Sequence, residues 1–267
     1  MVTIQTEKFS KLSFRKEGQG PVIVLIHGFP ETGGLWKQVW PMLTASFTVI
    51  VPDLPGAGES DLPSVQTSME VLAESINEIL INEGISEAVI VGHSMGGYTA
   101  MAFAELYAAK VKGLSLVHSV ASADNEEKKE TRRKSIELIR KGGKEPFISQ
   151  MIPNMFSPTF KAAHTSVIEE QVKRGMELAA ESMIAYYEAM IARPDRRNVL
   201  EKAGFPVQFI IGVDDALIPS EVALQQSSIS NRNFVSLYSD TGHMSMIENT
   251  ARLAEDLNEF GKYCYSH

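Results

Sequence analysis

The sequence predicts an α/β protein whose mostly parallel sheet is covered by helices on both faces. Continuous apolar runs of strand length recur along the chain, and amphipathic stretches of helical period separate them. Such runs indicate strands that are buried on both sides, as in a parallel sheet between two helical layers. With 44% hydrophobic and 22% charged residues, the 267-residue chain can form a full core.

The predicted strands follow one another in a regular order. Residues 9–15 alternate between apolar and polar side chains, as an exposed strand would. The other predicted strands are continuous apolar runs or rich in β-branched and aromatic residues. They cover residues 22–26, 47–51, 88–91, 114–117, 207–211 and 233–238.

Helical periodicity fills the intervals between strands. Residues 68–82 carry apolar side chains at helical spacing, and either Thr67 or Ser68 suits the N-cap. Residues 95–109 are small and apolar, as expected of a helix packed against a sheet. Residues 250–260 place three large apolar side chains on one face.

Residues 121–203 interrupt the alternation, because they contain no convincing strand. We expect them to form a helical cap (lid) subdomain, with residues 1–120 and 204–267 as the core domain. Four prolines divide the interval into helices, and its methionines and aromatics are expected to line the roof of an apolar pocket, although single members could simply pack in the core. The charged run 124–134 is typical of a solvated helix face.

The segment after the strand at 88–91 carries the strongest chemical signal. It reads Gly92-His93-Ser94-Met95-Gly96 and opens an alanine-rich helix. The pattern G-x-S-x-G between a strand and a helix is typical of a nucleophile elbow. The tight turn crowds the serine backbone, so that a Cβ at Gly92 or Gly96 would clash with neighbouring chain. Ser94 is therefore the predicted nucleophile, and the helix N-terminus points its free N–H groups at it.

A serine nucleophile needs a base and an acid that orients the base. Among the six histidines, His243 follows the last predicted strand in a short loop, and we expect it to be the base. Asp214 and Asp215 both stand in the acidic loop after the strand at 207–211. Because loop aspartates often form Asx turns, one of the two is expected to be structural.

The developing oxyanion needs backbone N–H donors. Met95 follows the nucleophile and is expected to supply the first. The loop after the strand at 22–26 reads His27-Gly28-Phe29-Pro30, and Gly28 permits a close approach of the backbone. We expect the Phe29 N–H to be the second donor, the alternative being an ordinary Gly-Pro turn.

Together these motifs resemble the α/β-hydrolase superfamily over nearly the whole chain. The resemblance is carried by the segments 27–30, 53–60, 92–97, 212–219 and 242–243. It implies an eight-stranded, mostly parallel sheet with a helical cap after the sixth strand, and a structural role for the 53–60 loop. In that family the acid stands three residues after the strand-end glycine and four before a proline, which implies Asp215. The chain order Ser, Asp, His also agrees with the family.

The loop at residues 27–31 is most similar to epoxide hydrolases and haloalkyl dehalogenases, whose elbow carries an aspartate. Ser94 replaces that carboxylate, so acyl transfer through serine is the expected chemistry. The glycine-rich motifs of lipases and proline iminopeptidases are absent, which disfavours both. We expect a serine hydrolase of the carboxylesterase type acting on small to medium esters. Alternatives with the same triad are a lactonase, a C–C bond hydrolase, a perhydrolase or a lyase, and outside the enzymes a slow-turnover ligand receptor.

The substrate pocket is expected to draw on residues from the elbow, the cap and the last loop. These are Phe29, Met95, Tyr186, Tyr187 and Met244. No metal site and no cofactor are expected, because the acyl-transfer constellation needs neither. The sequence leaves open which ester is cleaved.

The bulk composition restricts the partners. A net charge of −8 argues against nucleic acid and against an anionic membrane surface, so the expected partner is a small-molecule ester. The first residues lack the features of a signal peptide, and no apolar run reaches the length of a membrane span. Cys264 is the only cysteine, which together with the missing signal peptide favours a cytoplasmic protein. A monomer or a homodimer is expected.

Overall fold

The computed structural model describes all residues 1–267 and contains one eight-stranded sheet. Its strand order is β1-β2-β4-β3-β5-β6-β7-β8. β1 and β2 pair antiparallel at one edge, and all strands from β4 onward in this order pair parallel. The strands are β1 (Val2–Ile4), β2 (Leu12–Glu17), β3 (Val22–Ile26), β4 (Thr48–Pro52), β5 (Ala88–His93), β6 (Val111–Val117), β7 (Val207–Gly212) and β8 (Asn233–Tyr238). The predicted α/β fold with a mostly parallel sheet is confirmed.

The helices fall into two groups. The first group precedes β6 or follows β7: α1 (Trp40–Leu43), α2 (Met69–Asn82), α3 (Met95–Leu106), α10 (Ser220–Ser227), α11 (Ser245–Glu248) and α12 (Thr250–Ser266). The second group lies between β6 and β7: α4 (Glu126–Arg140), α5 (Lys144–Met151), α6 (Pro158–Ala163), α7 (Thr165–Gly175), α8 (Ala180–Ala192) and α9 (Arg197–Glu201). Short 3₁₀ helices cover Gly33–Trp36, Ala108–Lys110 and Ile152–Met155.

Several predicted elements agree closely with the structure, and one does not. β3 and β8 coincide with their predicted ranges, and Ser68 caps α2 because its side chain accepts a hydrogen bond from the N–H of Val71 over 3.2 Å. The expectation of an exposed strand at 9–15 is wrong. β2 lies between β1 and β4, and its first three residues are buried.

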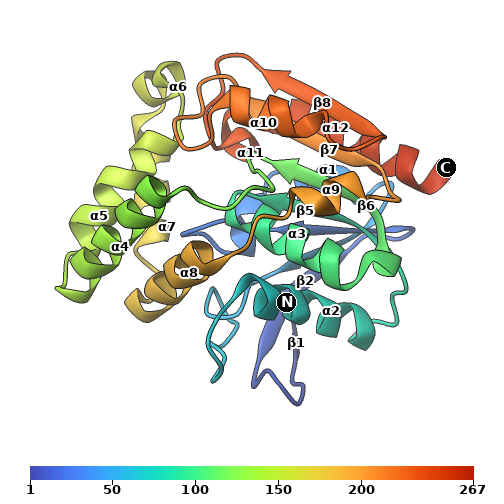
Figure 1. The fold of residues 1–267 in the computed structure, drawn as a ribbon, viewed down its shortest axis with the longest axis horizontal. Helices are drawn as coiled ribbons and strands as arrows, with labels where there is room; N and C mark the ends of the chain where they lie inside the picture. Colours follow the sequence, from blue (N-terminus) through green and yellow to red (C-terminus); the bar gives the residue numbers. More distant parts are fainter.

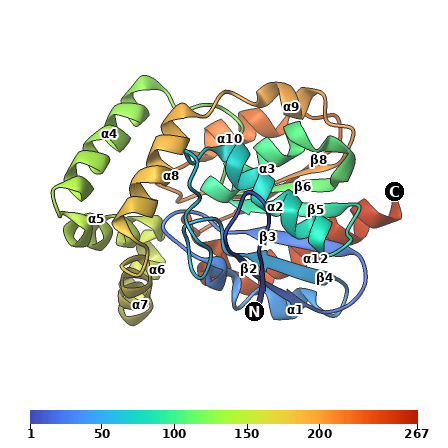
Figure 2. The same ribbon diagram turned by 90° about the horizontal axis from the view of Figure 1, so that it is seen from below.

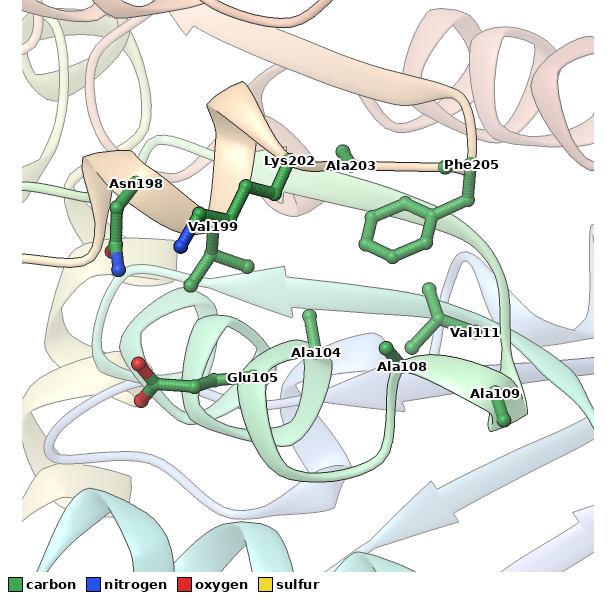
Figure 3. A pocket seen from close by; sticks show the side chains of 11 residues that line it. Ala104, Glu105, Ala108, Ala109, Val111, Asn198, Val199, Lys202, Ala203 and Phe205 are labelled. Atoms are coloured by element: carbon green, nitrogen blue, oxygen red, sulfur yellow. The ribbon is translucent and has the colours of Figure 1, made fainter.

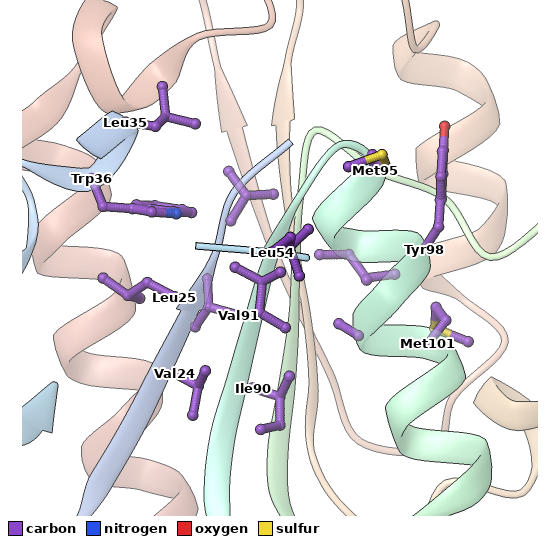
Figure 4. Close-up of a cluster of buried hydrophobic side chains, with 14 of the residues drawn as sticks. Val24, Leu25, Leu35, Trp36, Leu54, Ile90, Val91, Met95, Tyr98 and Met101 are labelled. Atoms are coloured by element: carbon purple, nitrogen blue, oxygen red, sulfur yellow. The ribbon is translucent and has the colours of Figure 1, made fainter. Parts of the chain in front are cut away.

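The parallel strands lie between two helical layers. α3 packs against β3, β5 and β6, whereas α12 packs against β6 and α1. Figure 4 shows β3 and β5 between Trp36 on one side and Tyr98 and Met101 of α3 on the other. Val24 and Val91 are fully buried between these layers. The core therefore supports the first turn of α3, which Ser94 immediately precedes.

The segment between β6 and β7 contains helices and no strand. Both views place α4 to α7 together on one side of the sheet (Figures 1 and 2). Within this group α4 packs against α8 and α5, and α7 packs against α5 and α6. None of the protein's helices combines the length and the hydropathy that a bilayer span requires.

Candidate active site

Ser94 occupies the sharp turn between β5 and α3. Its backbone angles are φ 52° and ψ −117°, a conformation that L-residues rarely adopt. The N–H of Ser94 donates to the carbonyl of Val117 over 3.0 Å, and the hydroxyl of Ser119 donates to the carbonyl of Ser94 over 2.8 Å. Contacts with the end of β6 therefore hold this strained residue on both sides of its Cα.

The two glycines around Ser94 are required by the close approach of backbone segments. A Cβ on Gly92 would lie 2.5 Å from the carbonyl carbon of Gly96. A Cβ on Gly96 would lie 2.5 Å from the carbonyl oxygen of Ile26. Real Cβ atoms do not approach backbone atoms this closely, so the clash expected from the sequence is present at both positions.

We expect Gly96→Ala to lower the free energy of unfolding by about 1–3 kcal/mol. The overlap with backbone oxygens outweighs the gain in helix propensity, which is roughly 1 kcal/mol. Urea unfolding of the variant and of wild type measures the difference. Gly204→Ala is the matched control, because no atom lies within 4 Å of its added Cβ. Equal losses of stability in the two variants would contradict the steric argument.

His243 is held by one contact to its imidazole and two contacts to its backbone, from three parts of the chain. Its Nδ1 lies 2.7 Å from Oδ2 of Asp215, and the carboxylate can only accept this hydrogen bond. The N–H of His243 donates to the carbonyl of Met155 over 2.7 Å, and Nε2 of His93 donates to the carbonyl of His243 over 2.9 Å. Because Nδ1 carries the proton, Nε2 is left as the basic nitrogen, and it has no partner in the protein.

Asp215, and not its neighbour Asp214, faces His243. Oδ1 of Asp215 accepts hydrogen bonds from the N–H groups of Leu217 and Ile218 over 2.8 and 3.0 Å. Burial would raise the pKa of this carboxyl, but the neighbouring imidazoles of His243 and His118 outweigh burial and hold the pKa below its usual range. The Asp214 side chain makes no hydrogen bond in the protein.

His118 is a site residue that the sequence did not reveal beyond its position at the end of a strand. It follows β6 with a φ of 49°, and its Nδ1 lies 3.5 Å from Oδ2 of Asp215. The N–H of Gly212 donates to the same Nδ1 over 3.3 Å, so the proton of the neutral ring sits on Nε2. Burial lowers the pKa of His118, which keeps the ring neutral beside the acid.

The same three side chains are the group that comes nearest to a metal site. The ligand atoms of His118, Asp215 and His243 lie within 4.8 Å of one another. Nδ1 of His243 points its hydrogen at Asp215, and Nδ1 of His118 accepts from Gly212. Nδ1 of His243 and Nδ1 of His118 are thus already engaged in hydrogen bonds within the protein.

The two predicted oxyanion donors are unpaired. Neither the N–H of Phe29 nor that of Met95 donates to an acceptor within the protein. Met95 is the first residue of α3, where backbone N–H groups have no partner within the helix. Both groups can therefore bind an oxyanion next to Ser94.

A cavity of about 240 Å³ opens at Ser94. The side chains that line it include Phe29, Tyr98, Phe147, Tyr187, Met190 and Ile218. The Phe29 and Tyr187 rings are in contact, with centroids 4.6 Å apart. Residues of α4, α5 and α8 thus share the cavity with Ser94.

Three of the five expected pocket residues do not line this cavity. Tyr186 is fully buried, and its hydroxyl donates to the carbonyls of Pro55 and Leu54 over 2.8 and 3.3 Å. Met95 and Met244 are fully buried as well, so their side chains belong to the core. The expectation is wrong for these three side chains. Met95 stays at the site through its backbone N–H.

A larger cavity of about 620 Å³ lies away from Ser94, between the end of α3 and α9 (Figure 3). Alanine side chains, Val199 and Phe205 line most of it, with Glu105 and Lys202 at one side. None of its lining residues is a serine, a cysteine or a histidine, so it has no counterpart of the groups near Ser94.

Comparison with known proteins agrees with this geometry. A family model described as the alpha/beta hydrolase fold matches residues 21–141. The malate-bound structure of a thermophilic esterase from Thermogutta terrifontis is 30% identical, with a TM-score of 0.93 and 98% of each chain covered. The chain belongs to the alpha/beta hydrolase fold family. Its family and its similarity to this esterase structure identify the protein as a hydrolase.

Two further relatives are named as enzymes that catalyse different reactions. A pimeloyl-[acyl-carrier protein] methyl ester esterase of Pseudoalteromonas atlantica is 26% identical over 93% of this chain and 97% of that protein. A soluble epoxide hydrolase of a Corynebacterium species is 34% identical, but over only 35% of this chain and 33% of that protein. The chain is therefore similar both to an esterase and, over a shorter stretch, to an epoxide hydrolase, which are the two likenesses noted in its sequence.

The 53–60 loop of this alpha/beta hydrolase is structural, as expected. Oδ1 of Asp53 accepts from the N–H of Gly33 over 2.8 Å, and its Oδ2 accepts from the N–H of Glu59 over 3.1 Å. The hydroxyl of Ser60 donates to the Asp53 carbonyl over 2.7 Å. The carboxylate of Asp53 thereby joins two loops of the core.

The charged run 124–134 is only partly a solvated helix face. Asp124 is buried, and Arg132 donates from Nε to its Oδ2 over 2.7 Å with only 13% of the arginine side chain exposed. Arg193, which follows α8, pairs with the same carboxylate over 2.9 Å. The hydrogen bonds and charges of the two arginines outweigh burial and lower the pKa of Asp124 to about 2.

Proposed function

We propose that this alpha/beta hydrolase is a serine carboxylesterase that cleaves small to medium carboxylic esters through an acyl-enzyme on Ser94. The observation that carries the proposal is the 2.7 Å contact between His243 and Asp215. Oδ1 of Asp215 is bound by Leu217 and Ile218, which line the same cavity as Ser94. A hydroxyl, a base and an orienting acid are the parts that acyl transfer requires.

In the first half of the reaction, Oγ of Ser94 attacks the ester carbonyl carbon and Nε2 of His243 takes the hydroxyl proton. Asp215 holds the imidazole in the tautomer that leaves Nε2 basic, and its negative charge stabilises the imidazolium. The N–H groups of Phe29 and Met95 bind the oxyanion. The tetrahedral intermediate then breaks the bond to the alcohol, which leaves with the proton from His243.

In the second half, water attacks the acyl carbonyl carbon while His243 takes its proton. The acid product leaves when the bond to Oγ breaks and Ser94 regains a proton from His243. No metal ion and no organic cofactor enters these steps.

The cavity and the relatives support esters as the substrate class. A volume of about 240 Å³ is small for a ligand site, which favours a short acyl part. The Thermogutta terrifontis protein is an esterase, and the Pseudoalteromonas atlantica protein is a methyl ester esterase. We further propose that residues 121–203 act as the cap of the site, because α4, α5 and α8 contribute to the cavity wall.

A fluorophosphonate labelling experiment tests the proposed nucleophile. Wild type is expected to hydrolyse p-nitrophenyl butyrate, to bind a single phosphonate on Ser94 and to lose its activity on labelling. Ser94→Ala is expected to show neither turnover nor labelling. Undiminished ester hydrolysis by Ser94→Ala would refute the mechanism. A panel of acyl lengths, run beside a lactone and an epoxide, defines the substrate class.

A further inference from the structure

One wall of the cavity at Ser94 is cationic. Lys128 and Arg132 stand one turn apart on α4, and both line the cavity. No aspartate or glutamate lines it, although the whole chain carries a net charge of −8. The cavity wall is therefore positive although the molecule as a whole is negative, which indicates an anionic ligand.

Arg132 presents free donors toward this cavity. Its Nε donates to Asp124, but neither of its terminal NH₂ groups donates to an acceptor in the protein. Its guanidinium carbon lies 5.3 Å from the centre of the Tyr187 ring, which also lines the cavity. The guanidinium is thus fixed from two sides while its outer donors stay available, in a side chain of which only 13% is exposed.

The negative charge next to Arg132 is already neutralised. Arg193 binds both oxygens of Asp124, over 2.9 and 3.0 Å, and stacks on Tyr98 with its guanidinium carbon 3.7 Å from the ring centre. Asp124 and the two arginines together keep one positive charge. Lys128 adds another, and its Nζ donates to the carbonyl of Leu217, on the loop that holds Asp215, over 3.2 Å.

We propose that this cavity selects half-esters of short dicarboxylic acids, whose free carboxylate binds Arg132 with Lys128 close by. The inference rests on the proposed esterase function and names its substrate class. A guanidinium pairs with a carboxylate through two parallel hydrogen bonds. A neutral acyl chain of the same shape would leave the NH₂ groups of Arg132 desolvated and unpaired, and this penalty provides the discrimination.

The test compares two substrates of matched shape. These are mono-p-nitrophenyl glutarate and the p-nitrophenyl ester of glutaramic acid, in which a neutral amide replaces the carboxylate. We expect kcat/KM of wild type to favour the anionic ester by about 10- to 100-fold. Arg132→Met is expected to bring this ratio close to one. Arg133→Met is the matched control on the same helix, because Arg133 is 49% exposed, pairs with Glu130 and lines no part of the cavity.

Equal kcat/KM values for the two esters in wild type, or a ratio that Arg132→Met leaves unchanged, would overturn the inference. If Arg132→Met does not fold, the kcat/KM ratio of the two esters in wild type and its expected decrease in Lys128→Met still test the inference. Calorimetry with Ser94→Ala separates recognition from catalysis: monomethyl glutarate should bind at least about 10-fold more tightly than methyl glutaramate. That preference supports the carboxylate site even if no ester is turned over, whereas equal binding overturns it.

Discussion

Asp215→Asn is expected to lower kcat for ester hydrolysis about 10⁴-fold without unfolding the protein. An asparagine fits the same space and can still accept from the N–H groups of Leu217 and Ile218, which bind Oδ1. It removes the negative charge opposite Nδ1 of His243, over the 2.7 Å contact that sets the tautomer. The base is then misoriented and its imidazolium loses its counter-charge.

The neighbouring aspartate provides a matched control. Asp214 directly precedes Asp215 in the chain. Its backbone N–H donates a hydrogen bond to the carbonyl of Thr241, and Asp214→Asn keeps this contact. We therefore expect Asp214→Asn to have a kcat close to that of wild type. Turnover of p-nitrophenyl butyrate and thermal unfolding measured on the same preparations check both variants. A severe loss in Asp214→Asn, with Asp215→Asn near wild type, would mean that the acid is misassigned.

Features that depend on local backbone geometry could be predicted from the sequence. The turn at Ser94 needs glycines at fixed offsets, so the motif identifies both the strand before it and the helix after it. β3 is a continuous apolar run, and its bounds agree with the prediction. The spacing from Gly212 to Asp215, taken with the family resemblance, indicated the aspartate that contacts His243.

Features that depend on distant contacts could not be predicted in this way. Tyr186 and Tyr187 are adjacent on α8, so only one of them can face the cavity, and the sequence did not set the rotation of that helix. His118 meets Asp215 only because β6 and β7 are neighbours in the sheet. No local pattern marks such a pair.

A signal for Arg132 was present in the sequence. Arg132 stands four residues before Ile136 and seven before Ile139, the two buried residues of α4. It therefore belongs to the inward stripe of a helix that is otherwise highly charged. A charged residue in phase with a buried stripe indicates a buried partner, which here is Asp124.

The buried carboxyl of Glu31 is expected to make stability fall as the pH rises. The side chain is 3% exposed, and its Oε1 has no partner. Burial raises the pKa of Glu31 from 4.5 to about 7. Below pH 4.5 Glu31 is protonated in both the folded and the unfolded chain. Its burial then carries no ionisation cost, and the free energy of unfolding has its full value. As the pH rises to about 7, the unfolded chain releases the proton first, so roughly 3 kcal/mol is lost.

Glu31→Gln should remove this loss, because the amide is neutral at every pH and has nearly the same shape. Urea unfolding of wild type and variant at pH 4.5 and pH 8 should show a stability difference that shifts by roughly 3 kcal/mol in favour of the variant. Other titrating groups cancel in this comparison. Glu59→Gln serves as control, because the Glu59 side chain is 61% exposed and its substitution should leave the pH dependence unchanged. Parallel stability curves for wild type and Glu31→Gln would show that Glu31 is ionised in the folded protein at little cost.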